Sequence, residues 1–259
     1  MKLLKTLSVA VILSASALTA TTTFADIREK GREVVQKHAD ALISVEVVSE
    51  AKFSYGGQQT ERESKNQVNG IALNPEGLVL VPLSELDPAS LAERISPGEE
   101  ADFTITIKSI RYILADGTEV PAKLVLRDND LDLAFLQPEA ALEKPMAAID
   151  FSVEATAPKL LDPVMALARA GRVAGRAPLG MSGELQGVVE KPQTYYIPSS
   201  ELVSSGSGVP IFNEGGQVIG VVLIRVLTGG RNVSMDGESP YLYVVVPNLE
   251  IFDASEQIE

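Results

Sequence analysis

A serine lies between two glycines in the segment Val203–Phe212, which reads VSSGSGVPIF. Glycines on both sides let the backbone bend tightly or approach another group closely, which suits a reactive hydroxyl and a plain turn alike. A serine acts as a nucleophile only when a nearby base takes its proton. Ser207 is therefore a candidate nucleophile, and the rest of the chain has to supply the base.

The chain offers few bases for this role. Its one histidine, His38, lies in a charged segment near the beginning of the chain, where a helical histidine is usually a solvated surface residue. A desolvated lysine is a second kind of base, although nothing in the sequence places one beside Ser207. The lysines in the body of the chain are Lys123, Lys144, Lys159 and Lys191. Cysteine is absent, which excludes thiol catalysis and thiolate metal sites.

The elements that must position Ser207 are mostly short strands. From Leu42 onward, β-rich apolar runs alternate with turn residues, and hairpin turns are predicted where Gly follows Asn, Asp or Glu between such runs. Helix is expected only in residues 26–41 and over Asp87–Arg94. The polar segments Glu50–Asn69 and Gly229–Pro240 are expected to be surface loops. Many short strands with little helix predict an all-β sandwich or a pair of barrels.

Charge and hydropathy limit the partners and the location. The 259 residues contain 35 Asp and Glu against 22 Lys and Arg, a net charge of −13, which repels nucleic acid and anionic lipid. Residues 1–25 carry two lysines, a short apolar run and small residues that end at Ala25, the pattern of a secretory signal peptide. No later apolar stretch is long enough to span a membrane. The sequence therefore predicts an exported protein, periplasmic or extracellular.

Three segments, in this order, resemble the trypsin-like serine protease domain, and most closely its bacterial HtrA-type branch. Asn69–Ser84 is similar to the hairpin that leads to the family's catalytic histidine. Asp116–Leu136 is similar to the stretch that carries the catalytic aspartate in a D-L-A motif. The segment around Ser207 is similar to the family's G-N-S-G-G-P motif, and Tyr243–Pro247 resembles its closing strand. The resemblance covers Leu42–Ile251. It is to the protease domain alone, without the PDZ module that many HtrA-type proteins have.

This resemblance implies a role for several residues. Ser207 falls on the nucleophile position and Asp132 on the acid position, but Ser84 stands where the family has its histidine. A hydroxyl does not accept a proton near neutral pH, so efficient catalysis by a triad is not expected. The oxyanion loop is formed by Ser205, Gly206 and Ser207, with Ser205 in place of a glycine and therefore less free to aim its N–H group.

Two further interpretations concern residues beside these positions. Val209 replaces a second glycine of the motif, which predicts crowding next to Ser207. The acidic run from Asp128 to Asp132 suggests calcium only weakly, because it lacks the glycine and the later glutamate of an EF-hand loop. Neither a metal nor another cofactor is expected.

The resemblance also implies an architecture and a function. We expect two antiparallel six-stranded-type β-barrels, the first over about 42–145 with Ser84 and Asp132, the second over about 155–251 with Ser207. The expected function is that of a pseudoprotease that holds a peptide or protein in the former substrate cleft, near Gly220–Val226. A weak or unconventional serine endopeptidase that uses Ser207 is one alternative. A structural envelope protein is another, and the sequence leaves the oligomeric state open.

Overall fold

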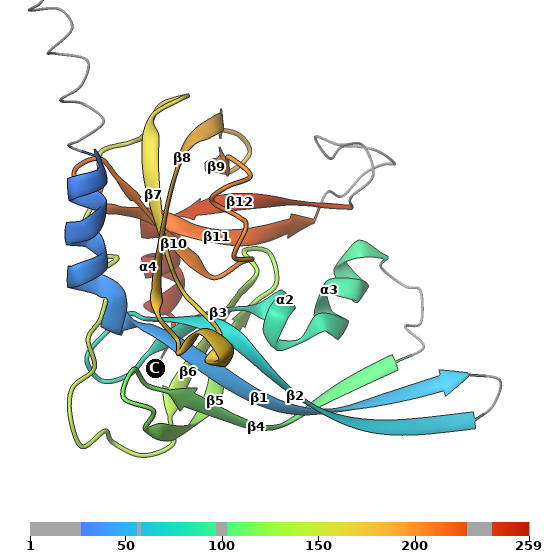
Figure 1. The fold of residues 1–259 in the computed structure, drawn as a ribbon. Coiled ribbons are helices and arrows are strands. Elements are labelled where there is room, and N and C mark those ends of the chain that lie inside the picture. The colour runs from blue at the N-terminus through green and yellow to red at the C-terminus, as the bar shows by residue number, and fades with distance from the viewer. Residues whose placement is uncertain (1–26, 56–57, 97–102, 227–239, 259) are drawn as a thin grey trace, which may run out of the picture.

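Two closed β-barrels, each of six antiparallel strands, make up most of the protein (Figure 1). The structure is a computed structural model that describes residues 27–55, 58–96, 103–226 and 240–258. The strand order is β1-β2-β3-β6-β5-β4 in the first barrel and β10-β11-β12-β9-β8-β7 in the second. This pair of barrels confirms the predicted all-β fold, whereas the predicted signal peptide lies outside the described residues.

The strands of the first barrel are β1 (Leu42–Tyr55), β2 (Gln58–Ala72), β3 (Val79–Pro82), β4 (Phe103–Ile113), β5 (Glu119–Asp128) and β6 (Leu133–Pro138). Those of the second are β7 (Pro163–Arg169), β8 (Pro178–Val189), β9 (Tyr195–Pro198), β10 (Val209–Asn213), β11 (Val218–Val226) and β12 (Tyr241–Pro247). The helices are an N-terminal helix (residues 27–38), α2 (Leu83–Leu86), α3 (Pro88–Ile95) and α4 (Asn248–Ser255), with 3-10 turns η1 (Ala39–Ala41) and η2 (Arg172–Ala174). No helix in these ranges is both long and apolar enough to cross a bilayer.

The core explains why several strands are apolar on both faces. One buried cluster fills the first barrel, a second fills the other barrel, and a third lies between them. In β3, Val79 and Val81 belong to the first-barrel cluster, whereas Leu80 belongs to the cluster between the barrels. Successive side chains of a strand point to opposite faces, so β3 is buried throughout. β3 thereby contributes both to the core of the first barrel and to the interface between the barrels.

The predicted surface loop over Glu50–Asn69 is wrong, because strands β1 and β2 occupy nearly all of it. They form a long hairpin that extends away from both barrels, with β4 along the other edge of β1 (Figure 1). Cross-strand ion pairs support it: Lys52 Nζ lies 2.7 Å from Glu61 and Lys65 Nζ lies 2.8 Å from Glu46. The prediction was wrong because polar residues are typical of surface loops but also of solvated strands, where charges paired across two strands stabilise the sheet.

The expected exposure of His38 is also wrong. The N-terminal helix packs on the second barrel, where the His38 ring is buried and stacks on Phe212 with 5.2 Å between ring centroids. Arg169 of β7 donates hydrogen bonds to the carbonyl groups of Leu42 and Ala39, which hold the end of the helix in place. Burial lowers the pKa of the His38 imidazole, because the protonated ring is disfavoured away from water. His38 is thus a core residue.

Candidate active site

Residues of both barrels meet at one buried site. Ser84 is the second residue of α2, the single helical turn that follows β3, and Asp132 directly precedes β6. Ser207 lies in the turn before β10, and its side chain is buried. Ser84 and Asp132 therefore come from the first barrel and Ser207 from the second. The structure brings Ser84 and Asp132 into direct contact, but it pairs Ser207 with a residue that the sequence analysis did not consider.

The Asp132 carboxylate is fully buried and surrounded by hydrogen-bond donors. The backbone N–H and the hydroxyl of Ser84 donate to its two oxygens, at 2.9 and 2.8 Å. The Arg94 guanidinium of α3 lies 2.6 Å from Oδ1, and the backbone N–H of Ile224, in the second barrel, donates to Oδ2 at 3.2 Å. Burial raises the pKa of Asp132, while Arg94 and the hydrogen bonds from Ser84 and Ile224 oppose that rise. The acid is saturated by structural partners and orients no base.

The Ser207 hydroxyl donates a hydrogen bond to the carboxylate of Glu85, with 2.5 Å between Oγ and Oε1. Glu85 follows Ser84 in α2, and neighbouring residues in a helix point in directions about 100° apart. Ser84 accordingly faces Asp132 while Glu85 faces Ser207. A carboxylate thus takes the contact that an imidazole makes in a serine–histidine pair.

The environment of Glu85 disfavours its charge. Burial raises the pKa of the Glu85 carboxyl, and the negative charge of Asp132 adds to the rise, whereas hydrogen bonds from the Ser207 hydroxyl and backbone oppose it. A raised pKa makes the carboxylate a stronger base than an exposed glutamate. It also means that ionisation of Glu85 at neutral pH lowers the stability of the folded state.

Two glycines and an asparagine shape the loop around Ser207. Gly206 and Gly208 adopt positive φ angles of 84° and 74°, which an L-residue rarely adopts. A Cβ atom on Gly208 would lie 3.0 Å from the Asn69 carbonyl oxygen and from Pro82, so the loop approaches the first barrel closely. The Asn69 side-chain amide donates to the carbonyl groups of Ser205 and Ser207, at 3.3 and 3.1 Å. The loop is therefore fixed from both barrels.

Two sequence expectations concern this loop. The side chain of Val209, which was expected to crowd Ser207, is fully buried in the core of the second barrel. Ser205 avoids the left-handed region, which Gly206 occupies instead, so the missing glycine imposes no backbone strain at Ser205. The side chain of Ser205 donates to the Met181 sulfur of β8 at 3.4 Å.

The alternative bases have no described contact with Ser207. Its hydroxyl donates to Glu85, and the His38 ring packs on Phe212. The acidic run before β6 makes an ordinary turn, in which Asp128 Oδ1 accepts the backbone N–H groups of Asp130 and Leu131. Within the described ranges, no group of three or more acidic or histidine side chains is arranged to hold a metal ion.

Sequence reasoning missed Glu85, Arg94 and Asn69. The signal for Glu85 was present, since an acid next to the vacated histidine position is the nearest proton acceptor along the chain. Arg94 lies 38 residues from Asp132, and only the packing of α3 against the turn before β6 brings the two together. Asn69 reaches the Ser207 loop across the barrel interface, which no local pattern indicates.

Replacing the half-buried Glu85 tests its charge state. We expect Glu85→Gln to be more stable than the wild type at pH 8, on the order of 1 kcal/mol, because the amide stays neutral and its oxygen still accepts the Ser207 hydroxyl. A folded-state pKa above the unfolded value gives stability that is complete below the ordinary pKa of 4.5 and lost as the pH rises through the raised pKa. The difference should therefore vanish near pH 4 in urea denaturation. Glu76→Gln, in an exposed turn, is the control. A wild type more stable than Glu85→Gln at pH 8 would refute this account.

Comparison with known proteins agrees with the fold. The family model described as a trypsin-like peptidase domain matches residues 68–221, which is more than half of the chain and includes Ser84, Glu85, Asp132 and Ser207. A search of curated proteins finds no match. The chain therefore belongs to the trypsin-like peptidase domain family.

Proposed function

We propose that this protein is an exported, non-hydrolytic member of the family that binds an extended peptide or protein segment. The observation that carries the proposal is the exchange of partners at the site: Asp132 accepts the Ser84 hydroxyl, and Ser207 donates to Glu85. No imidazole stands between the acid and the nucleophile, and base removal from such a triad costs on the order of 10⁶ in turnover. Export rests on residues 1–25, and protein sequencing of the mature chain is expected to begin at Asp26.

The edge of β11 supports the binding part of the proposal. β10 pairs with β11 only as far as Val209 opposite Val222, whereas β12 pairs with β11 up to Val226. The Ile224 N–H points away from β12, since it donates to Asp132. By the alternation of an antiparallel strand, the N–H and C=O groups of Val226 lie on the same edge. Beyond Val222 this edge has no described strand partner, and after Ile224, whose N–H is taken by Asp132, the groups of Val226 can pair with an added strand.

A substitution at this edge tests peptide binding. We expect Val226→Pro to weaken, by about tenfold or more, the binding of peptides selected on the wild type from a random library, because proline removes the N–H that pairs with an added strand. Val173→Pro, at a fully exposed position in η2, is the matched control and should bind as the wild type does. Fluorescence anisotropy with labelled peptides measures both. Equal affinity in all three proteins would contradict binding at this edge, and a library without binders would favour the structural envelope alternative.

A second candidate function is slow hydrolysis by a Ser207–Glu85 dyad. It is favoured by the 2.5 Å hydrogen bond and by the raised pKa of Glu85, since a general base works best with a pKa near the working pH. A casein digestion assay separates the two functions. The dyad requires activity that both Ser207→Ala and Glu85→Gln abolish, whereas the binding function requires equal background in all three proteins.

A further inference from the structure

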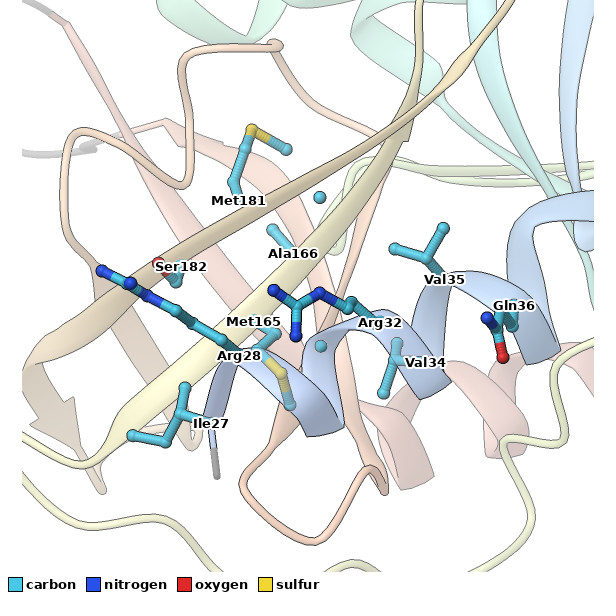
Figure 2. A pocket seen from close by; sticks show the side chains of 12 residues that line it. Ile27, Arg28, Arg32, Val34, Val35, Gln36, Met165, Ala166, Met181 and Ser182 are labelled. Atoms are coloured by element: carbon cyan, nitrogen blue, oxygen red, sulfur yellow. The ribbon is translucent and has the colours of Figure 1, made fainter. Parts of the chain in front are cut away.

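A hollow of about 430 Å³ lies on the second barrel, between the N-terminal helix and strands β7 and β8 (Figure 2). This volume is within the range of about 300 to 1,000 Å³ that is common for small-molecule sites. Its apolar floor is made by Val34 of the helix and by Met165 of β7, both of them buried. Val35 of the helix and Gly180 and Ser182 of β8 also line it.

Two of the residues that line the hollow are glycines packed closely against other lining residues. A Cβ atom on Gly31 of the helix would lie 3.3 Å from the Met165 sulfur. One on Gly180 of β8 would lie 3.3 Å from Cγ2 of Val35. Both distances are shorter than ordinary van der Waals contact, so a side chain at either position would press on the walls. Gly31 also costs the helix stability relative to alanine, on the order of 1 kcal/mol.

The charged groups around the hollow have one sign. Arg28 and Arg32, one helical turn apart, both extend across it from the helix (Figure 2). Both are exposed, and neither forms an ion pair within the described part of the chain. None of the described residues that line the hollow is acidic, although the whole chain carries a net charge of −13. Two cations beside an apolar cavity therefore complement an anionic group on an apolar tail.

We propose that this hollow binds a single-chain amphiphile with one carboxylate, such as a medium-chain fatty acid. The tail packs on Val34, Val35 and Met165, where it is removed from water. The carboxylate lies at the mouth, where the guanidinium groups of Arg28 and Arg32 donate charge-assisted hydrogen bonds. This site is separate from the β11 edge and requires no reaction at Ser207.

The Met181 side chain lies on the other face of the sheet. Met181 pairs with Ala166 and both pack against the core of the second barrel, whereas Met165 faces the helix (Figure 2). The Met181 sulfur accepts hydrogen bonds from the hydroxyls of Ser204 and Ser205, at 3.5 and 3.4 Å. The Met165 methyl group is therefore the methionine probe that faces the hollow.

Methionine-methyl NMR on the full chain tests the site with decanoate as the probe. We expect a saturable shift of the Met165 methyl resonance and none of Met146, which packs against the core of the first barrel. 1-Decanol has the same tail without the charge, and its affinity should be lower than that of decanoate by about tenfold or more.

The double variant Arg28→Gln/Arg32→Gln should bind decanoate about tenfold more weakly than the wild type, and 1-decanol equally well. Arg172→Gln, at an exposed position of the same barrel, should leave both affinities unchanged. Equal decanoate binding by the double variant, equal shifts at Met146, or no saturable shift would each overturn the site.

Discussion

The double variant Ser84→His/Glu85→Ala is expected to react with a fluorophosphonate at Ser207 at least about 100-fold faster than the wild type. An imidazole at position 84 can donate to Asp132 in place of the Ser84 hydroxyl, which now lies 2.8 Å from Oδ2. Its other nitrogen can accept the Ser207 proton only when the Glu85 carboxylate no longer holds that hydroxyl. A positioned general base contributes typically about 10²- to 10⁴-fold, and the lower end allows for the altered oxyanion loop. Intact-mass spectrometry over time measures the rate.

Two further variants show whether the Glu85 contact also limits the reaction and which residue reacts. Ser84→His alone should gain less than about tenfold, because the Glu85 contact with Ser207 remains. Adding Ser207→Ala to the double variant should abolish labelling and so identify the reacting residue. If the double variant reacts no faster than the wild type, the missing base is not what limits the reactivity of Ser207, and the oxyanion loop becomes the limiting feature.

Arg94→Gln is expected to lower the free energy of unfolding by about 3 kcal/mol at pH 7.5, since breaking a buried ion pair leaves the other charge uncompensated. Asp132 is fully buried, and the Arg94 side chain, 15% exposed, is its cationic partner at 2.6 Å. Loss of Arg94 removes the largest of the effects that oppose the rise in the pKa of Asp132. A carboxyl whose folded-state pKa is raised loses stability as the pH increases, so the destabilisation should be larger at pH 8 than at pH 5.

A surface ion pair provides the control for this prediction. Arg111 lies 3.2 Å from Glu119 and both side chains are about half exposed, so Arg111→Gln should change stability by less than about 1 kcal/mol. Urea denaturation at the two pH values measures both variants. An Arg94→Gln effect no larger than the Arg111→Gln effect would show that Asp132 does not depend on Arg94 as its counter-ion.

The fold was predictable because its signals are local. The apolar runs that become β3, β6, β10 and β11 are separated by turn residues, and their order along the chain matches a known family pattern. The β1–β2 hairpin was missed because paired charges on a solvated sheet look like loop composition. His38 was misplaced because the charges beside it face solvent while its own ring faces Phe212.

The site was predictable only in part. The positions of Ser84 and Asp132 follow from the motifs, and the structure places the two side chains in contact. The partner of Ser207 was not predicted, because only histidine and lysine were considered as bases and carboxylates were not. Which residue of α2 faces which barrel depends on the orientation of a single helical turn. That orientation is set by tertiary packing, which a sequence pattern does not contain.

Fluorophosphonate labelling of the wild-type protein between pH 5 and pH 8, with Ser207→Ala as the background, tests the central claim most directly. The claim is that Ser207 is held by a carboxylate that does not activate it. We predict no modification of the wild type above the level of Ser207→Ala at any of these pH values. Modification of Ser207 at a rate close to that of an ordinary serine protease would contradict the claim, and loss of that reaction in Glu85→Gln would identify the carboxylate as the base.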